Sequence, residues 1–399
     1  MSSQNASTIP LGIIYSQTGV TANVELSMLR ATLLSIDRIN RLGGVNGQQL
    51  EALCLDPESI AENYGKLAQQ LIVEKGVKLI FGGYTSSSRK AMLPVVCRYN
   101  VLLFYPTHYE GFEYAPNVIY TGAAPNQGCL QLAQYMLDNV GKRVCMVGSD
   151  YIWPREINRI MRDLVTESNG EILSESYRSL ETDKAAVEQV VKEVIEQKPD
   201  FIFANFVGKS IEFFYQAMFD LTSGRPIAIA SLTTTETDIQ AMGVDAGKGH
   251  YTSAPYFQSI DSPINIELVN EYKSIYGNDQ VTNMCWEAAY FQVQLAIKAL
   301  QLANSYHPDD ILEQLPIVKY MAPQGEVQID AENHHSYLWP RIGQVNSQGQ
   351  FDILATSKFA LKPDPFLVLY SASGPSAMLV NATVSEECEQ PSPLSGIQL

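Results

Sequence analysis

The sequence predicts an α/β protein of two lobes, each a mostly parallel sheet flanked by helices. Three observations indicate this fold class: the chain has 399 residues, strand-length apolar runs alternate with helical patterns, and the alternation restarts after Pro125. This length exceeds what a single core normally serves. Strands that alternate with helices build parallel sheets that helices cover on both faces.

The first α/β unit of the chain contains four predicted strands. Apolar residues recur at helical spacing after the first strand, and Gly43-Gly44 ends that helix. The predicted strands are 9–15, 50–55, 77–81 and 101–105, and further helices are expected around 64–72 and over 87–98.

The second unit repeats the same alternation without repeating the sequence. Its predicted helices are 130–140, 157–165, 187–195 and 213–218, and its predicted strands are 144–147, 172–177, 201–204 and 227–230. The chain after Tyr256 is mainly helical, at 263–276, 283–303 and 308–315, and then strand-like at 327–329, 338–345 and 351–355. We expect these late helices to return to the first unit. Residues 371–399, rich in Ser, Gly, Pro and Glu, are expected to form a flexible tail or a docking arm.

The composition excludes several classes of protein. Hydrophobic residues make up 46% of the chain and charged residues 18%, which is typical of a globular protein. The net charge of −16 argues against direct contact with nucleic acid or an anionic membrane, because such proteins usually present a basic face. No apolar run approaches the roughly 18 residues that a membrane-spanning helix needs, so we expect no membrane insertion.

The start of the chain and its cysteines suggest a compartment. Residues 1–7 lack Lys and Arg, and no apolar segment precedes the strand at Ile9, so we expect no signal peptide. The six cysteines form no disulfide framework, and three of them, Cys54, Cys97 and Cys145, lie in apolar runs typical of buried free thiols. We therefore expect a cytoplasmic location. A periplasmic location, with a leader removed before Met1, is the alternative.

A strand, a tight turn and the start of a helix follow one another early in the chain. The apolar run 77–81 ends at two glycines, and Tyr84, Thr85 and Ser86 open the helical pattern. The first turn of a helix has backbone N–H groups without partners, which a Ser or Thr side chain caps or a ligand oxygen occupies. Since the turn contains no lysine of the Walker type, a small neutral or zwitterionic ligand suits it better than a phosphate.

Hydroxyl and aromatic residues also follow the other predicted strands at their C-terminal ends. Ligands of open α/β sheets bind outside these ends. The candidate ligand-binding residues at five strand ends are Tyr84, Thr85, Ser86, Tyr105, Pro106, Thr107, Tyr151, Trp153, Asn205, Thr233 and Thr234. For any one tyrosine, a half-buried packing role is the alternative.

Motifs for catalysis or metal binding are missing from the sequence. Gly208-Lys209-Ser210 resembles the end of a Walker loop, but Phe203 stands where the loop requires its first glycine. The sequence has no nucleophile elbow of the G-x-S-x-G type, and its only adjacent histidines are His334 and His335. We therefore expect no enzyme activity, no cofactor and no metal.

The combination of motifs resembles the type I periplasmic-binding-protein fold, in the branch that binds urea and short aliphatic amides. The matching segments are Gly82–Lys90, Phe104–Gly111, Tyr120–Gln127, Val147–Tyr151, Ser231–Thr234, Tyr256–Asp261, Glu287–Tyr290, Ala322–Gly325 and Lys362–Pro365. The resemblance covers about residues 8–366 and implies two lobes joined by three hinge crossovers, near 121–125, 252–256 and 330–340. The lobes would comprise 8–121 plus 256–330 and 122–255 plus 331–370.

By matching position, the resemblance implies ligand contacts at Tyr84, Ser86, Tyr105, Thr107, Tyr151 and Thr234. Hydroxyl and backbone groups can satisfy the C=O acceptor and the NH2 donors of an amide without any charge. Trp153 departs from the family pattern, which usually has a smaller aromatic residue there, and this leaves the size of the ligand open.

Two branches of the family compete. Tyr105-Pro106-Thr107 and Ser231–Thr234 resemble the cytoplasmic amide sensor of the aliphatic amidase operon, a negative regulator that controls an RNA-binding antitermination protein. That branch is our first hypothesis. The alternative is the substrate-binding protein of an ABC importer for urea or short-chain amides, with a permease as its partner. The sequence leaves the oligomeric state open.

Overall fold

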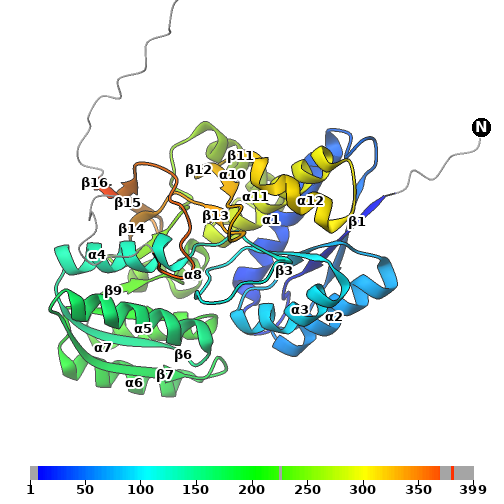
Figure 1. Cartoon of the computed structure of the whole chain (residues 1–399). Coiled ribbons are helices and arrows are strands. Elements are labelled where there is room, and N and C mark those ends of the chain that lie inside the picture. The colour runs from blue at the N-terminus through cyan, green and yellow to red at the C-terminus, as the bar shows by residue number, and fades with distance from the viewer. Residues whose placement is uncertain (1–7, 224–226, 369–378, 382–399) are drawn as a thin grey trace, which may run out of the picture.

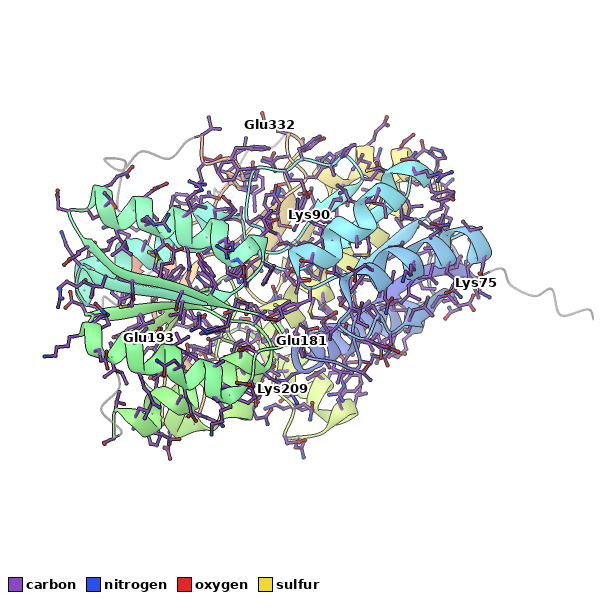
Figure 2. All side chains as sticks on the ribbon, turned by 90° about the horizontal axis from the view of Figure 1, so that it is seen from below. Lys75, Lys90, Glu181, Glu193, Lys209 and Glu332 are labelled. Atoms are coloured by element: carbon purple, nitrogen blue, oxygen red, sulfur yellow. The ribbon has the colours of Figure 1, made fainter. Side chains whose placement is uncertain are left out.

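The computed structural model describes residues 8–223, 227–368 and 379–381, and it shows two α/β lobes side by side (Figure 1). The N-terminal strands, blue to cyan, and the yellow helices form one lobe, and the green segments form the bulk of the other. Figure 2 places Lys75 and Glu193 on opposite lobes. The predicted two-lobed α/β fold is confirmed.

The sheet of the N-terminal lobe is entirely parallel, with strand order β2-β1-β3-β4-β5. Its strands are β1 (Ile9–Ile14), β2 (Leu50–Leu55), β3 (Leu79–Gly82), β4 (Leu102–Tyr105) and β5 (Val118–Tyr120). β3 and β4 are buried at every position, as is typical of parallel strands with helices on both faces. The helices of this lobe are α1 (Ala22–Arg41), α2 (Ala61–Lys75), α3 (Ser86–Tyr99), α11 (Met284–Ala303) and α12 (Pro308–Gln314).

The second lobe contains a larger mixed sheet in the order β16-β15-β14-β10-β9-β8-β6-β7. Its parallel strands are β6 (Arg143–Ser149), β7 (Glu171–Arg178), β8 (Phe201–Asn205), β9 (Ala228–Ser231) and β10 (Tyr251–Ala254). Its antiparallel strands are β14 (Arg341–Val345), β15 (Phe351–Ser357) and β16 (Leu379–Asn381). The helices are α4 (Cys129–Asn139), α5 (Ile152–Glu167), α6 (Lys184–Gln197), α7 (Lys209–Leu221), α8 (Glu236–Met242) and α9 (Val244–Gly247).

A small antiparallel sheet and the remaining helices complete the described chain. The sheet consists of β11 (Lys319–Ala322), β12 (Gly325–Ile329) and β13 (Ser336–Tyr337), and the helices are α10 (Pro263–Tyr276), η1 (Pro125–Gln127) and η2 (Leu315–Ile317). Helix α11 packs against α1, which brings residues far apart in the sequence into one layer, as expected from the late helices. Within the described ranges, no helix is both long and apolar enough to cross a bilayer.

The predicted elements agree with the structure except for short strands, two short helices and the tail. The periodicity did not predict the strands β5, β10, β11 and β13, because two to four residues are too few to show an alternation. It did not predict the short helices α8 and α9 either. The predicted tail lies outside the described residues apart from 379–381, which form β16 on the edge of the large sheet. Those three residues form a strand, and the prediction of a flexible tail or a docking arm stays a prediction.

The cysteine prediction is wrong for two residues. Cys145 is buried as expected, but Cys54 and Cys97 are exposed, although all three are free thiols. An apolar run in the sequence marks a covered strand or helix without showing which of its side chains point outward. The argument for a reducing compartment loses this support.

Arg341 ties together three segments of the chain. Its guanidinium donates hydrogen bonds to the carbonyl oxygens of Pro255, Trp339 and Gln324, the last two at 2.8 Å. The side-chain amide of Gln324 in turn donates to the buried carboxyl of Glu287 at 2.7 Å. Because each carbonyl belongs to a different segment, one side chain fixes their relative positions.

Two buried carboxyl groups of α8 have no cationic partner among the residues that the structure describes. Glu236 and Asp238 are each 2% exposed, and burial raises the pKa of Glu236 to about 8 and that of Asp238 to about 7. The backbone N–H of Gln258 donates to Glu236 at 2.8 Å, and Thr235 donates to Asp238. Burial favours the protonated form of such groups, because an isolated charge loses its hydration.

We predict that replacing Glu236 by Gln flattens the dependence of stability on pH. The unfolded carboxyl ionises near pH 4.5, so the folded state is progressively disfavoured as the pH rises from there to about 8. One proton contributes a slope of at most about 1.4 kcal/mol per pH unit. Urea unfolding between pH 5 and 8 should show Glu236→Gln gaining stability over the wild type as the pH rises.

A carboxylate at the surface provides the control for this measurement. Glu196 on α6 is exposed, so Glu196→Gln should reproduce the wild-type slope. Parallel curves for the wild type and Glu236→Gln over the whole range would contradict the prediction.

The close packing around Gly122, two residues after β5, leads to a second prediction about stability. The N–H of Thr121 donates to the carbonyl of Tyr105, and a Cβ at Gly122 would lie 1.9 Å from the carbonyl oxygen of Thr107. Gly122→Ala should therefore lower the free energy of unfolding by about 1–3 kcal/mol, the usual cost of overpacking. Gly128→Ala, whose Cβ would meet only Leu232 at 3.6 Å, should cost less, and equal losses would contradict the explanation.

Candidate functional site

A cavity lies where the carboxyl ends of strands from both lobes meet. It is lined by Tyr84, Ser86, Tyr105, Thr107, His108, Tyr151, Trp153, Val207, Thr233, Met284 and Cys285. The centre of a water-sized sphere can move through ≈ 20 Å³ of it. A cavity of this size admits only a few non-hydrogen atoms.

The structure brings seven of the eleven candidate residues together at this cavity. Four follow strands of the N-terminal sheet and three follow strands of the large sheet: Tyr84, Ser86, Tyr105 and Thr107, and Tyr151, Trp153 and Thr233. The prediction that they bind a ligand remains a prediction.

The other four candidates lie close by but do not line the cavity. Thr85 caps α3, where its hydroxyl accepts from the N–H of Ser88 at 3.2 Å. The amide of Asn205 donates to Asn158 at 2.9 Å, and the hydroxyls of Thr234 and Tyr215 are 2.9 Å apart. These contacts give each of the three a structural role. Pro106 separates two cavity residues in the chain and is buried.

Four residues of the cavity wall were not predicted. His108 and Val207 lie in loops that contain candidates, and their proximity in sequence could have suggested them. Met284 and Cys285 come from the first turn of α11, nearly two hundred residues beyond Tyr84. No strand precedes them, so the pattern of strand ends carries no signal for this part of the wall.

The backbone carbonyl of Tyr84 organises one side of the cavity. It accepts hydrogen bonds from the hydroxyls of Tyr105 and Thr107, both at 2.8 Å. Each hydroxyl has a single proton, which it gives to this carbonyl. Toward a ligand, the two oxygens therefore present lone pairs and accept hydrogen bonds.

Two further hydroxyls of the cavity also donate their protons to groups of the protein. Thr233 donates to the carbonyl of Phe206 at 2.7 Å, and Ser86 donates to the carboxylate of Glu110 at 2.7 Å. Their protons also point into the protein, so their oxygens too are acceptors for a ligand.

Three other groups of the wall keep donors available. Among the described residues, the phenolic hydroxyls of Tyr84 and Tyr151 have no hydrogen-bond partner within the protein. Trp153 is only 3% exposed, and its buried indole Nε1 has no hydrogen-bond partner among the described residues. A buried donor without a partner is costly, and a ligand acceptor would satisfy it.

The cavity wall has no charge at neutral pH. None of the lining residues is Asp, Glu, Lys or Arg. Burial lowers the pKa of His108 to about 4, which leaves the imidazole neutral, and its Nε2 lies 3.2 Å from the sulfur of Met284. Burial raises the pKa of Cys285 and of the cavity tyrosines, so the thiol and the phenols stay protonated.

The arrangement is suited to binding rather than to covalent chemistry. A nucleophile needs a base within hydrogen-bond reach or a lowered pKa, whereas burial shifts the Cys285 thiol in the opposite direction. In the part of the chain that the structure describes, no cluster of three His, Cys, Asp or Glu side chains could hold a metal ion.

Comparisons with curated proteins identify relatives. The chain is 26% identical over 278 residues to Leu/Ile/Val-binding protein homolog 6 of Brucella abortus, covering 67% of this chain and 70% of that one. A stretch of 126 residues is 34% identical to a limonene hydroxylase of Geobacillus stearothermophilus, which is 32% of this chain but only 23% of that protein.

Solved structures share the fold over nearly the whole length. The solute-binding protein of an ABC transporter from Rhodopseudomonas palustris BisB5, in complex with 3,4-dihydroxybenzoic acid, superposes with a TM-score of 0.79. The match covers 89% of this chain and 98% of that chain at 22% sequence identity. At this identity the likeness establishes the fold, while the ligand is a property of the other protein.

The match to a family model shows to which protein family the chain belongs. The model of the periplasmic binding protein domain matches residues 9–372, which is most of the chain and both lobes. Ligand binding is the function that its relatives share, and apart from the short match to a hydroxylase they are binding proteins and not enzymes. The two lobes, the cavity between their strand ends and this match together show that the chain belongs to the periplasmic binding protein domain family.

Proposed function

We propose that this protein binds a small neutral molecule with a carbonyl group and N–H donors, a short aliphatic amide or urea, in the cavity between its lobes. The observation that carries the proposal is the polarity of the uncharged wall. Four hydroxyl oxygens accept hydrogen bonds, because their protons are held within the protein, while the phenols of Tyr84 and Tyr151 and the indole of Trp153 can donate.

The chemistry of an amide complements this wall. Its NH2 group supplies two donors and its carbonyl oxygen accepts. The oxygens of Ser86, Tyr105 and Thr107 suit the NH2 group, and a donor from the second lobe suits the carbonyl. Since the cavity is small, a ligand of a few non-hydrogen atoms fits the closed form better than a larger one.

A charged ligand does not suit the same wall. The Leu/Ile/Val-binding relative and the protein with bound dihydroxybenzoic acid have ligands with carboxylate groups. Here the two arginines that follow cavity residues within three positions are engaged by carboxylates: Arg89 by Glu110 and Glu113, and Arg155 by Asp150. Burying an unpaired carboxylate is costly, so amino acids and aromatic acids should bind weakly.

We infer that the physiological role is that of the substrate-binding protein of an ABC importer. The relatives support this role, and it implies a permease as partner and a periplasmic location. In this proposal the lobes 8–121 plus 256–330 and 122–255 plus 331–370 open and close about their three crossovers. The ligand stabilises the closed form because it contacts both lobes, which gives it different affinities for the two states.

A second role, that of a cytoplasmic amide sensor, is supported by the site residues. Tyr105 and Thr107 of the Tyr105-Pro106-Thr107 motif line the cavity, as does Thr233 of the Ser231–Thr234 motif, and both motifs resemble the sensor branch. In this role a surface changed by closure would control an RNA-binding antitermination regulator. The net charge of −16 suits contact with that protein better than contact with its RNA.

Calorimetric titration tests the ligand. We expect acetamide, propionamide or urea to bind, butyramide to bind more weakly because the cavity is small, and leucine and 4-hydroxybenzoate to give no heat. Thr107→Val keeps the shape of the side chain and removes the acceptor, so it should weaken acetamide binding by about tenfold. Thr166→Val, on the exposed surface of α5, is the matched control. Binding of leucine with no response to any amide would refute the proposed ligand class.

Uptake and gene expression distinguish the two roles. For an importer subunit, loss of the gene in the native organism should reduce uptake of labelled acetamide or urea at low external concentration and leave amidase induction intact. Unchanged uptake with altered amidase induction would overturn the importer role and favour the sensor.

A further inference from the structure

A buried chain of polar contacts runs from the surface of the N-terminal lobe to the cavity. Lys90 donates to Glu113 at 2.5 Å, Arg89 donates to Glu113 at 3.0 Å and to Glu110 at 2.7 Å, and Ser86 donates to Glu110 at 2.7 Å. Figure 2 labels Lys90 on α3, where this chain of contacts begins. The last member, Ser86, lines the cavity, whereas Arg89 and Glu110 do not.

The ion pair in the middle of this chain is fixed in place. Arg89 is fully buried, Glu110 is 2% exposed, and two nitrogens of the guanidinium contact the two oxygens of the carboxylate. The guanidinium carbon lies 5.0 Å from the ring centres of Tyr105 and Tyr109 and 5.9 Å from that of Tyr120. With partners on several sides, the carboxylate cannot turn away from Ser86 without leaving a buried charge unpaired.

The ionised carboxylate decides what Ser86 offers to a ligand. A carboxylate only accepts hydrogen bonds, and a serine hydroxyl has one proton. Because the Ser86 proton goes to Glu110, the oxygen turns its lone pairs toward the cavity. The ligand group opposite Ser86 must then be a donor, such as an N–H.

We propose that Glu110 is a specificity-determining positioning residue: without touching the ligand, it holds Ser86 as an acceptor and thereby selects ligands with an N–H group over isosteres that lack one. The inference rests on the proposed function, because it concerns the ligand of the same cavity. The carbonyl of Tyr84 does the same for Tyr105 and Thr107, but that acceptor belongs to the backbone and cannot be changed by substitution.

The variant Glu110→Gln tests whether residue 110 positions Ser86, because the side chain keeps nearly the same shape. The amide of Glu110→Gln can donate to Ser86, which frees the hydroxyl proton to point into the cavity. Acetamide and acetone have nearly the same shape and differ in the NH2 group. Titration with both should show that Glu110→Gln lowers the preference for acetamide over acetone by about tenfold, the value of one charge-assisted hydrogen bond.

Glu113→Gln is the matched control. Glu113 contacts the same arginine but not Ser86, so this variant makes the same change of charge and should keep the wild-type preference. Equal weakening of acetamide and acetone binding by Glu110→Gln would reveal a structural role and overturn the proposal. A fall in preference of the same size in Glu113→Gln would also overturn it.

A double variant separates the pathway through Ser86 from other effects. Ser86→Ala alone should lower the preference for acetamide by a similar factor. Adding Glu110→Gln to Ser86→Ala should change the preference no further, because the hydroxyl through which Glu110 acts is gone. Independent, multiplying effects would contradict the proposal.

The hydroxyl proton can be observed without any ligand. In protein labelled with ¹³C-serine, nuclear magnetic resonance should show a slowly exchanging hydroxyl proton at Ser86, absent from Ser86→Ala, moved in Glu110→Gln and retained in Glu113→Gln. If the wild type binds neither acetamide nor urea, the proposed function fails, and this signal still decides the orientation of Ser86. A wild-type Ser86 hydroxyl that exchanges as fast as one in water would overturn the inference, even if amides bind. Should Glu110→Gln not fold, the wild-type signal and Ser86→Ala decide the outcome.

Discussion

One backbone carbonyl, that of Tyr84, fixes the polar side of the cavity. The chain turns at Gly83, whose φ of 84° is accessible to glycine at no steric cost. A Cβ there would lie 3.0 Å from Met92 and 3.3 Å from the ring of Tyr105. Gly82, the last residue of β3, and Gly83 thus allow the next carbonyl to accept from Tyr105 and Thr107. The acceptor character of Tyr105 and Thr107 therefore originates in the backbone turn.

The fold and the ligand are decided by different residues. The relatives bind chemically different ligands on the same two-lobed frame, as expected when function depends on side chains at the strand ends. In this chain, the wall contains hydroxyls, aromatic rings and a neutral histidine, with no charged group. An uncharged wall discriminates through unpaired donors and acceptors, because a ligand that leaves one of them unsatisfied loses about 1–3 kcal/mol.

Much of this architecture could be predicted from the sequence, and the exceptions have physical reasons. Long buried strands and amphipathic helices gave nearly correct bounds, as in α10, because periodicity is reliable over many residues. The parallel sheets brought strand ends such as Tyr84 and Tyr151 into one cavity. Met284 and Cys285 could not be predicted, since the packing of α11 on α1 brings them there. Thr85 caps a helix and the amide nitrogen of Asn205 donates to Asn158, and sequence alone does not distinguish such structural contacts from ligand contacts.

Two buried acidic residues near the cavity, Glu110 and Glu236, have different partners, and this difference matters for ligand binding. Glu110 has Arg89 as a partner and remains a hydrogen-bond acceptor, which holds the proton of Ser86. Glu236 has no cationic partner in the described part of the chain, and burial raises its pKa to about 8, so it is mostly neutral at pH 7. An ion pair fixes the orientation of a carboxylate, whereas burial without a cation favours the protonated form of a carboxyl. An acceptor that must present the same face to every ligand is therefore better held by an ion pair than by a lone acid.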